Sequence, residues 1–520
     1  MSIIFLCAGC AEMNLTSPLS SDSDNADTVS ENQEAVSAFV SMEDEALLSY
    51  EVPKSSPHIL IDQHGYASDS TKQAFFFGSN LPTAFKVIDA DSKSVVYQGI
   101  IESRGYSDVY EANIASGDFS SVTEKGTYYI EANLLGCSYS FQIGDNLYQD
   151  LFCQACKTYY YNRCGMTLTE EFAGSNAHNA CHTEKSVLRD DMTVELDVSG
   201  GWHQDSTGSK EISSAATSLA TILLAYEVFP NAFDDDFGIP ESQNGIPDIL
   251  DEAKYEIDWL LKMQNQETGA VYSAVTVATA ENKSSVSYVE TPTIDSTRAF
   301  AFVLAKFSYV FQEYDKEYAT LCLKAADRAW KYAELNEEED SPWKMAAAAE
   351  IYRASGLKDC ERYLREYFLA GGYKEERDTI TFLGCVTYLS TTQPVDTAIC
   401  ADIIKVIMKN AELISQESRQ ASFLVPFEKE QTNNSELLSK MITMTLVDHI
   451  ISNHEYDMII ENYLHYFLGR NPMSITYLDN VGTYSYINVH ESLGLMKKFD
   501  EDSKLIFLLA KVISQDGFIE

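Results

Sequence analysis

Hydrophobic and polar positions follow two different patterns along the chain, and the change falls near residue 145. Before it, short runs such as KQAFFFGS, AFKVIDA and GTYYIEA are rich in β-branched and aromatic residues and are separated by Gly, Asp, Asn and Ser. About seven such runs at roughly ten-residue spacing predict an immunoglobulin-like β-sandwich over residues 57–145. No combination of catalytic residue types stands out there, so we expect this domain to support the rest of the chain.

From residue 146 onward, apolar residues recur with the 3.6-residue period of α-helices. About twelve helices in one mainly α domain predict six hairpins arranged as an (α/α)6 barrel over residues 146–520. A helical repeat array is the alternative, although no fixed repeat period is visible. The expected helices cover residues 146–163, 211–228, 247–264, 292–313, 315–334, 343–354, 358–370, 380–391, 394–414, 435–453, 455–468 and 500–515.

The first ten residues, MSIIFLCAGC, are similar to the end of a lipoprotein-type signal that finishes at Cys10. The basic start and most of the apolar stretch are missing, which a start codon assigned too far downstream would explain. An apolar N-terminus without a targeting role is the alternative. Residues 11–56 are rich in Ser, Asp, Glu and Asn and predict a disordered acidic linker. The two segments together predict an extracellular lipoprotein on a bacterial cell surface.

Acidic residues outnumber basic ones, with 79 Asp and Glu against 37 Lys and Arg and a formal net charge of -42. A field of this sign repels phosphate backbones and anionic membrane surfaces, which argues against nucleic-acid binding. No stretch is long and apolar enough to span a membrane, so we expect membrane contact only through a lipid anchor. The 11 cysteines are odd in number and scattered, which argues against a disulfide scaffold. We expect a monomer.

Four residues have the types that hold a closed zinc site. They are Cys164, Cys181, His182 and His203, spaced as C-x16-C-H-x20-H. Two thiolates and two imidazoles complete a tetrahedral zinc shell, which leaves no position for water and makes the role structural. The alternative is two buried thiols and two hydrogen-bonded histidines, and His178 is a substitute ligand.

Several stretches combine into one resemblance. In chain order they are ILIDQHGY, SYSFQIGDNLYQDLFCQACKTYYYNRCG, HNACHTE, DVSGGWH, FGIPESQNGIPDILDEAKYEIDWLLKMQ, AAAAEIYRASG and YLHYFLGRNPMSITY. Together they resemble glycoside hydrolase family 9, the cellulase and endoglucanase family, in its members with an N-terminal immunoglobulin-like domain. The resemblance covers residues 57–520 and implies an (α/α)6 barrel with an open cleft for β-1,4-linked glucan.

The resemblance also implies two metals. Members with the immunoglobulin-like domain carry a structural zinc, and its ligands match the four residues of the C-x16-C-H-x20-H pattern. The family often binds calcium as well, and the acidic loop NAFDDDFGIPES offers carboxylates for it at Asp234, Asp235 and Asp236. A solvated acidic loop is the alternative there.

The catalytic positions of the family are altered in this chain. Inverting glycosidases use one carboxylate to activate water and one carboxylic acid to protonate the leaving oxygen. The two aspartates on the base side match Gln204 and Thr207 in GGWHQDSTG, while Asp205 lies one residue away. The acid glutamate falls near Met496, and the basic sugar-binding motif before it is reduced to His490 beside Glu491.

These losses predict a family 9 homologue that no longer hydrolyses glycans and instead binds or scaffolds a β-glucan or related plant polysaccharide at the cell surface. The alternative is an active inverting β-1,4-glucanase that uses Asp205 and Glu491 in a rearranged site. A third hypothesis is a protein-interaction module without carbohydrate contact. The expected sugar-binding residues are Trp202, Tyr484, Tyr486 and His490.

Overall fold

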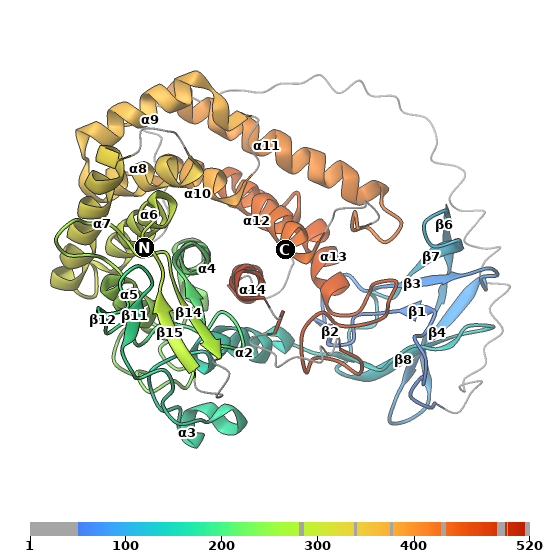
Figure 1. Ribbon diagram of the computed structural model, residues 1–520. Coiled ribbons are helices and arrows are strands. Elements are labelled where there is room, and N and C mark those ends of the chain that lie inside the picture. Colours follow the sequence, from blue (N-terminus) through green and yellow to red (C-terminus); the bar gives the residue numbers. More distant parts are fainter. Residues whose placement is uncertain are drawn as a thin grey trace.

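The computed structural model places a β-sandwich beside a helical barrel (Figure 1). Among the described residues, no helix is long and apolar enough to cross a membrane. The described residues are 50–279, 285–336, 341–374, 378–427, 433–485, 495–496 and 498–514.

The sandwich consists of two sheets whose buried faces meet in a core that includes Phe76, Phe85, Ile130 and Phe141. Alternate burial along the strands, as in β4, creates the apolar inner face. One sheet has the order β1 (Ile59–Leu60), β3 (Gln73–Gly78), β7 (Ala112–Asp118) and β6 (Glu102–Ser107). The other has the order β2 (Gly65–Tyr66), β10 (Phe141–Ile143), β8 (Gly126–Ala132), β4 (Ala84–Asp89) and β5 (Val95–Ile100), with β9 (Gly136–Cys137) paired to β8.

The helices form two rings, which confirms the predicted (α/α)6 barrel, and each of the twelve expected ranges overlaps one helix. Inner helices such as α6 and α14 are buried on nearly every face, whereas an outer helix such as α9 buries one stripe. The inner ring is α4 (Ile212–Val228), α6 (Ile294–Phe311), α8 (Pro342–Ser355), α10 (Thr379–Ser390), α12 (Asn434–Ile451) and α14 (Phe499–Ser514). The outer ring is α2 (Leu147–Tyr161), α5 (Asp248–Lys262), α7 (Lys316–Asn336), α9 (Lys358–Ala370), α11 (Thr397–Gln420) and α13 (Asp457–Phe467).

A small sheet outside the barrel was absent from the sequence expectation. It lies beside α5 in Figure 1 and connects the segment between α2 and α4 to the segment between α5 and α6. Because β13 pairs with β14, the start of α4 is fixed against a hairpin. The strand order is β12 (Glu195–Leu196), β11 (Ser186–Leu188), β15 (Ser285–Val289), β14 (Ala274–Thr279) and β13 (Lys210–Glu211).

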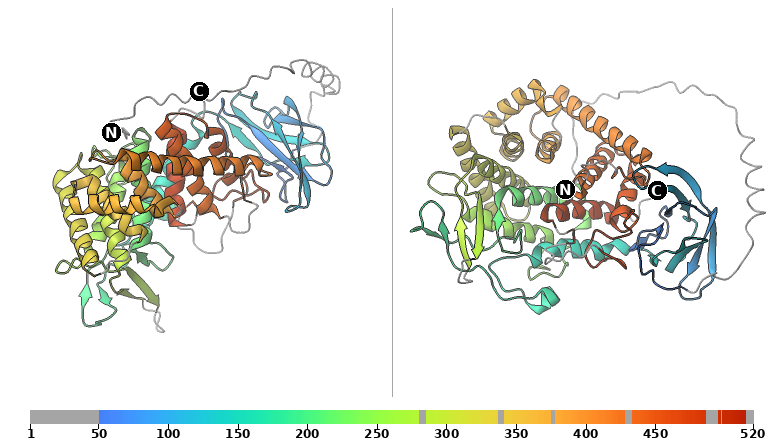
Figure 2. Two further views of the ribbon diagram at one scale, coloured as in Figure 1. Left: turned by 90° about the horizontal axis from the view of Figure 1, so that it is seen from above. Right: turned by 45° about the vertical axis from the view of Figure 1, so that its right-hand side comes forward.

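The sandwich is joined to the barrel through buried polar contacts, next to the helices at the C-terminal end of the chain (Figure 2). The Asp62 carboxylate lies 2.7 Å from Nδ1 of His465 on α13, and both residues are buried. Phe75 of the sandwich packs against Phe423, with ring centroids 5.5 Å apart. A hydrogen-bonded buried charge and an aromatic pair together fix the relative position of the two domains.

Candidate metal centre and the altered catalytic loop

Main-chain pairing brings Cys164 and His203 together. The segment that follows α2 lies antiparallel to the Gly-Gly-Trp turn. The Cys164 amide donates to the Gly201 carbonyl at 2.7 Å and the His203 amide to the Asn162 carbonyl at 2.8 Å. Gly201 has φ 73, and a Cβ there would lie 2.7 Å from the Trp259 ring. Only glycine combines this backbone conformation with so close an approach. The turn sequence therefore positions both residues.

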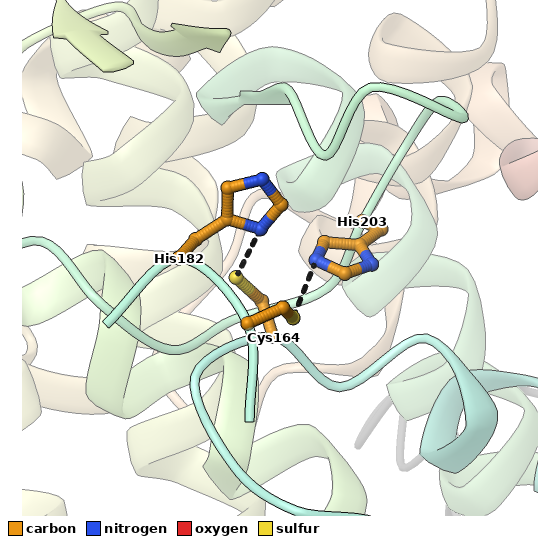
Figure 3. A group of neighbouring side chains, drawn as sticks. Cys164, His182 and His203 are labelled. Carbon is orange, nitrogen blue, oxygen red and sulfur yellow. Dashed lines mark hydrogen bonds between the residues drawn. The ribbon is translucent and has the colours of Figure 1, made fainter. Parts of the chain in front are cut away.

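The four predicted zinc ligands converge in the structure. One donor atom from each of Cys164, Cys181, His182 and His203 lies within 4.8 Å of the other three. The Cys164 Sγ to His182 Nδ1 distance is 3.7 Å (Figure 3). The Cys181 Sγ to His203 Nε2 distance is 3.4 Å. Bonds of about 2.3 Å to sulfur and about 2.0 Å to nitrogen place tetrahedral S and N ligands about 3.5 Å apart. The donor set and its spacing fit Zn²⁺.

The surroundings of the cluster favour one deprotonated thiol, because the hydrogen bond between the two cysteines lowers the pKa of Cys181 and raises the pKa of Cys164. The hydrogen bond with Cys164 lowers the pKa of the Cys181 thiol below its ordinary value, against the opposing effect of burial. The buried Lys210 ammonium lies 3.8 Å from Cys164 Sγ and donates to the Gly200 carbonyl at 2.6 Å. Its charge offsets part of the negative charge of two thiolates. His178, the substitute ligand, lies outside the cluster, and its Nδ1 contacts the Asn179 carbonyl at 2.8 Å.

Trp202 does not line an open surface, and its predicted contact with sugar is wrong for this structure. The side chain is 0% exposed and packs on Tyr159 and Phe499. Its Nε1 donates to Glu252 at 2.7 Å and its main-chain amide donates to Glu256 at 2.6 Å. The indole is therefore a buried anchor of the turn.

Glu252 and Glu256 hold the turn through Trp202, and the sequence pattern did not single them out. Both are buried on α5, and burial raises the pKa of Glu256 to about 8, although the nearby Lys210 opposes this. Arg163 is also buried, and it pairs with Glu252 at 2.9 Å. The signal in the sequence is the i, i+4 spacing of the two glutamates, which places both on one face of the helix. That face holds the turn that carries His203.

The loop after His203 is closed by its own side chains. The Gln204 Nε2 donates to the Glu211 carbonyl at 3.0 Å, and its Oε1 accepts from the Glu211 amide at 2.9 Å. Asp205 Oδ1 accepts from the Thr207 amide at 2.8 Å, the Thr207 hydroxyl at 2.7 Å and the Ser209 amide at 2.9 Å. Burial raises the pKa of Asp205, but these hydrogen bonds outweigh burial and the net shift is downward.

The acid side of the site has no carboxylate at its matched position. Met496 is 5% exposed and belongs to the hydrophobic core, and its amide donates to Asp502 Oδ1 at 3.1 Å. Tyr484 is 54% exposed and is available to a ligand. The three remaining residues of the prediction lie outside the described residues, and they are Tyr486, His490 and Glu491.

The acidic loop before α5 uses a carboxylate to hold its own backbone. Asp235 accepts from the amides of Gln243 and Gly245, both at 2.6 Å. Within the described residues, Asp234, Asp235 and Asp236 do not belong to a convergent group of metal ligands. Calcium at this loop stays a prediction.

Comparison with known proteins identifies the family. The profile of glycosyl hydrolase family 9 matches residues 148–505, and that of the cellulase N-terminal Ig-like domain matches residues 54–136. The chain belongs to glycosyl hydrolase family 9. The first of these spans contains the metal cluster, the altered loop and most of the barrel.

Known relatives are similar over most of their length. A cellodextrinase of Butyrivibrio fibrisolvens is 26% identical over 83% of this chain and 86% of its own. A xyloglucan-specific endo-beta-1,4-glucanase of Bacteroides ovatus is 26% identical over 84% of this chain and 82% of its own. Among solved structures, a metagenome-derived family 9 endoglucanase has a TM-score of 0.78 at 24% identity, covering 87% of this chain and 98% of its own. A zinc-binding triple mutant of family 9 endoglucanase J30 has a TM-score of 0.75 at 21% identity, covering 86% of this chain and 99% of its own.

Proposed function

We propose that this family 9 protein binds a β-glucan or related plant polysaccharide and does not hydrolyse it. The observation that carries the proposal is the paired hydrogen bonding of the Gln204 amide with the main chain of Glu211. At a position where the resemblance places a catalytic aspartate, this chain has an amide that closes a loop. An amide cannot accept a proton from water as a carboxylate does.

The neighbouring carboxylate does not supply the missing base. Asp205 is exposed, its Oδ1 already accepts three hydrogen bonds from its own loop, and those bonds lower its pKa. An effective general base instead has a pKa near the working pH. Loss of a general base alone reduces the rate by about 10²–10⁴, and Met496 leaves the acid position without a carboxyl group as well.

The ligand class follows from the relatives and from the surface. The relatives named above are a cellodextrinase and a xyloglucan-specific glucanase. Tyr484 presents an exposed ring, and aromatic rings offer the apolar face on which sugar rings stack. Cys10 supplies a lipid anchor and residues 11–56 supply a spacer, which place the chain on the outside of a bacterial cell. The chain acts there as a monomer.

We further propose that Zn²⁺ occupies the four-residue cluster as a structural ion. Two thiolates and two imidazoles fill a tetrahedral shell and leave no open position for water or substrate. When bound, the ion links the end of α2 to the Gly-Gly-Trp turn. The binding surface then stays ordered without taking part in chemistry.

Two assays on the full chain test the function. Affinity electrophoresis in gels containing β-glucan or xyloglucan is expected to retard the protein, and Tyr484→Ala to reduce the retardation. Reducing-sugar release from the same glycans and from cello-oligosaccharides is expected to stay at background. Turnover that Asp205→Ala or Glu491→Ala abolishes would overturn the proposal in favour of an active glucanase. Absence of both retardation and turnover would favour a protein-interaction module.

A further inference from the structure

The metal cluster has a charged neighbour, Lys210, whose burial the four ligands do not explain. The Lys210 side chain is 2% exposed, and its ammonium nitrogen lies 3.8 Å from Cys164 Sγ. Lysine is almost never fully buried unless its charge is paired. A buried ammonium at this position therefore requires a negative charge close to it.

Three acceptors surround the ammonium group of Lys210. Its Nζ donates to the Gly200 carbonyl at 2.6 Å and to the Val198 carbonyl at 3.2 Å, and the Cys164 sulfur is the third acceptor. An ammonium has three N–H donors, so these three contacts use all of them. The centroid of the Trp259 ring lies 5.1 Å from Nζ and adds a cation–π contact.

Of these three acceptors, the Cys164 sulfur is the one that can carry a full negative charge. The two carbonyls are neutral dipoles, and within the described part of the chain Lys210 forms no ion pair with a carboxylate. Glu256 acts on Lys210 through space, but its Oε2 is bonded to the Trp202 amide. The sulfur is therefore the atom in direct contact that can balance the ammonium.

The Cys164 sulfur carries that charge when a metal is bound. Thiols that bind zinc are deprotonated, so Cys164 and Cys181 are both thiolates in the metal-bound protein. Cys164 is fully buried, whereas Cys181 is partly exposed and so is screened by water. Lys210 thus contacts the thiolate of the pair that water does not reach.

The altered loop brings Lys210 to the cluster. This loop begins at the ligand His203 and ends where Lys210 pairs with Val275 across β13 and β14. Successive residues of a strand point to opposite faces, so Lys210 is buried while Glu211 is exposed. The two hydrogen bonds between Gln204 and Glu211 hold this end of the loop in place. The segment without the expected catalytic aspartates thus delivers an ammonium to the sulfur.

We propose that Lys210 is a positioning residue of the metal site, whose ammonium donates a charge-assisted hydrogen bond to the Cys164 thiolate and strengthens metal binding. The inference rests on the structural zinc proposed above and is independent of glycan binding. Hydrogen bonds to ionised groups are about twice as strong as neutral ones. Because the same ammonium holds the Val198 and Gly200 carbonyls, it also ties the turn that carries His203 to the opposite ligand.

Zinc affinity of the full chain, measured by competition with a chromophoric chelator at constant pH, tests the proposal with Lys210→Met. Loss of a residue that supports a metal ligand reduces metal affinity by about 10–100-fold, and we expect a reduction of this size. Lys210→Arg keeps the charge and is expected to bind more tightly than Lys210→Met. Lys262→Met is the matched control, because Lys262 also donates to the backbone of this segment, at the Ser199 carbonyl, and pairs with Asp197 rather than with a sulfur. Its affinity is expected to equal that of the wild type.

Cobalt(II) in place of zinc separates a contact with sulfur from a general loss of stability. In the sulfur-to-cobalt charge-transfer band an electron leaves the thiolate, and a positive charge beside the sulfur raises the energy of that transition. Lys210→Met is therefore expected to shift the band to longer wavelength, whereas Lys262→Met leaves it in place. A variant that is only less stable would show the wild-type band.

The outcomes distinguish the role of Lys210 from the zinc proposal on which it rests. A wild type that takes up neither zinc nor cobalt overturns both. Metal uptake by the wild type, with an unshifted band or an unchanged affinity in Lys210→Met, overturns the role of Lys210 alone. If circular dichroism shows that Lys210→Met does not fold, Lys210→Gln removes the charge and keeps a donor. An unshifted cobalt band in that variant overturns the role of Lys210 as well.

Discussion

Gln204 is bound to Glu211 by two hydrogen bonds, one donated by its amide nitrogen at 3.0 Å and one accepted by its amide oxygen at 2.9 Å. This pairing closes the loop that follows the metal ligand His203. Within the same loop Gly208 packs directly against His182, since a Cβ there would lie 2.3 Å from the imidazole. The loop on which the family resemblance places the catalytic base is thus part of the support for the metal cluster.

We predict that Gln204→Glu destabilises the protein and does not create hydrolysis. The carboxylate keeps the length of the side chain but loses the donor, so it places negative charge against the Glu211 carbonyl. Two half-buried hydrogen-bond acceptors that face each other without a donor lower the free energy of unfolding by about 1–3 kcal/mol. Urea unfolding measures the loss, with the exposed Ser206→Glu as a control of equal charge. Equal stability of the two variants would contradict the structural role of the amide.

We predict that the purified chain contains one zinc per molecule and loses stability when the metal is removed. A metal that binds only the folded state, at a free concentration one thousand times its dissociation constant, stabilises that state by about 4 kcal/mol. Elemental analysis measures the content, and the melting temperature with and without a chelator measures the stabilisation. Acidic buffer is expected to release the metal as well, because its ligands must be deprotonated.

Cys164→Ser separates zinc binding from nonspecific effects of the chelator. The variant is expected to melt at a lower temperature than the wild type and to be insensitive to the chelator. Cys153→Ser, on α2 and outside the cluster, is the matched control and is expected to keep full sensitivity. Absence of zinc, together with an unchanged melting temperature for Cys164→Ser, would rule out the metal.

The sequence predicts the four residues that converge, because two thiols and two imidazoles are the ligand set of a closed zinc site. It fails for Trp202, since an indole after a glycine turn looks the same whether it faces a cleft or a core. Glu252 and Glu256 decide that Trp202 faces the core, because Glu252 accepts from the indole N–H and Glu256 accepts from the main-chain N–H of Trp202. Charged residues on an amphipathic helix usually face water, so their burial depends on tertiary contacts that no local pattern encodes.

The fold shows the same division between local and tertiary information. Helical periodicity and continuous apolar runs predict the twelve long helices of the described residues, because the outer helices carry an apolar stripe and the inner ones are apolar on most faces. The five-stranded sheet is missed because β12 and β13 have only two residues each, and because the pairings of β11 with β15 and of β13 with β14 join segments far apart along the chain. Strands this short have no readable alternation, and pairing between distant segments creates them.

We predict that His465→Ala weakens the attachment of the sandwich to the barrel. The imidazole contacts Asp62 Oδ2 at 2.7 Å with both groups buried. Its removal leaves that oxygen without its side-chain partner, while Oδ1 keeps the amides of His64 and Gly65. Breaking a buried pair on one side costs about 3–5 kcal/mol.

His454 is exposed and contacts Asp457 at 2.8 Å, and Asp457 also pairs with Lys511. His454→Ala is therefore the control, with an expected loss of about 0–1 kcal/mol. Denaturant unfolding compares the two, and similar losses would contradict the prediction.

We predict that Asp502→Asn stabilises the protein increasingly as the pH rises. Burial raises the pKa of Asp502 to about 8, so between about pH 4 and that value the folded chain holds a proton that the unfolded chain has released. The stability of the wild type therefore falls through this window, whereas asparagine keeps the acceptor for the Met496 amide and does not titrate. Unfolding free energies at pH 5 and pH 8 are expected to diverge by on the order of 1–3 kcal/mol in favour of the variant. The exposed Asp359→Asn is the control, and a difference that is constant with pH would show that Asp502 is ionised in the folded state.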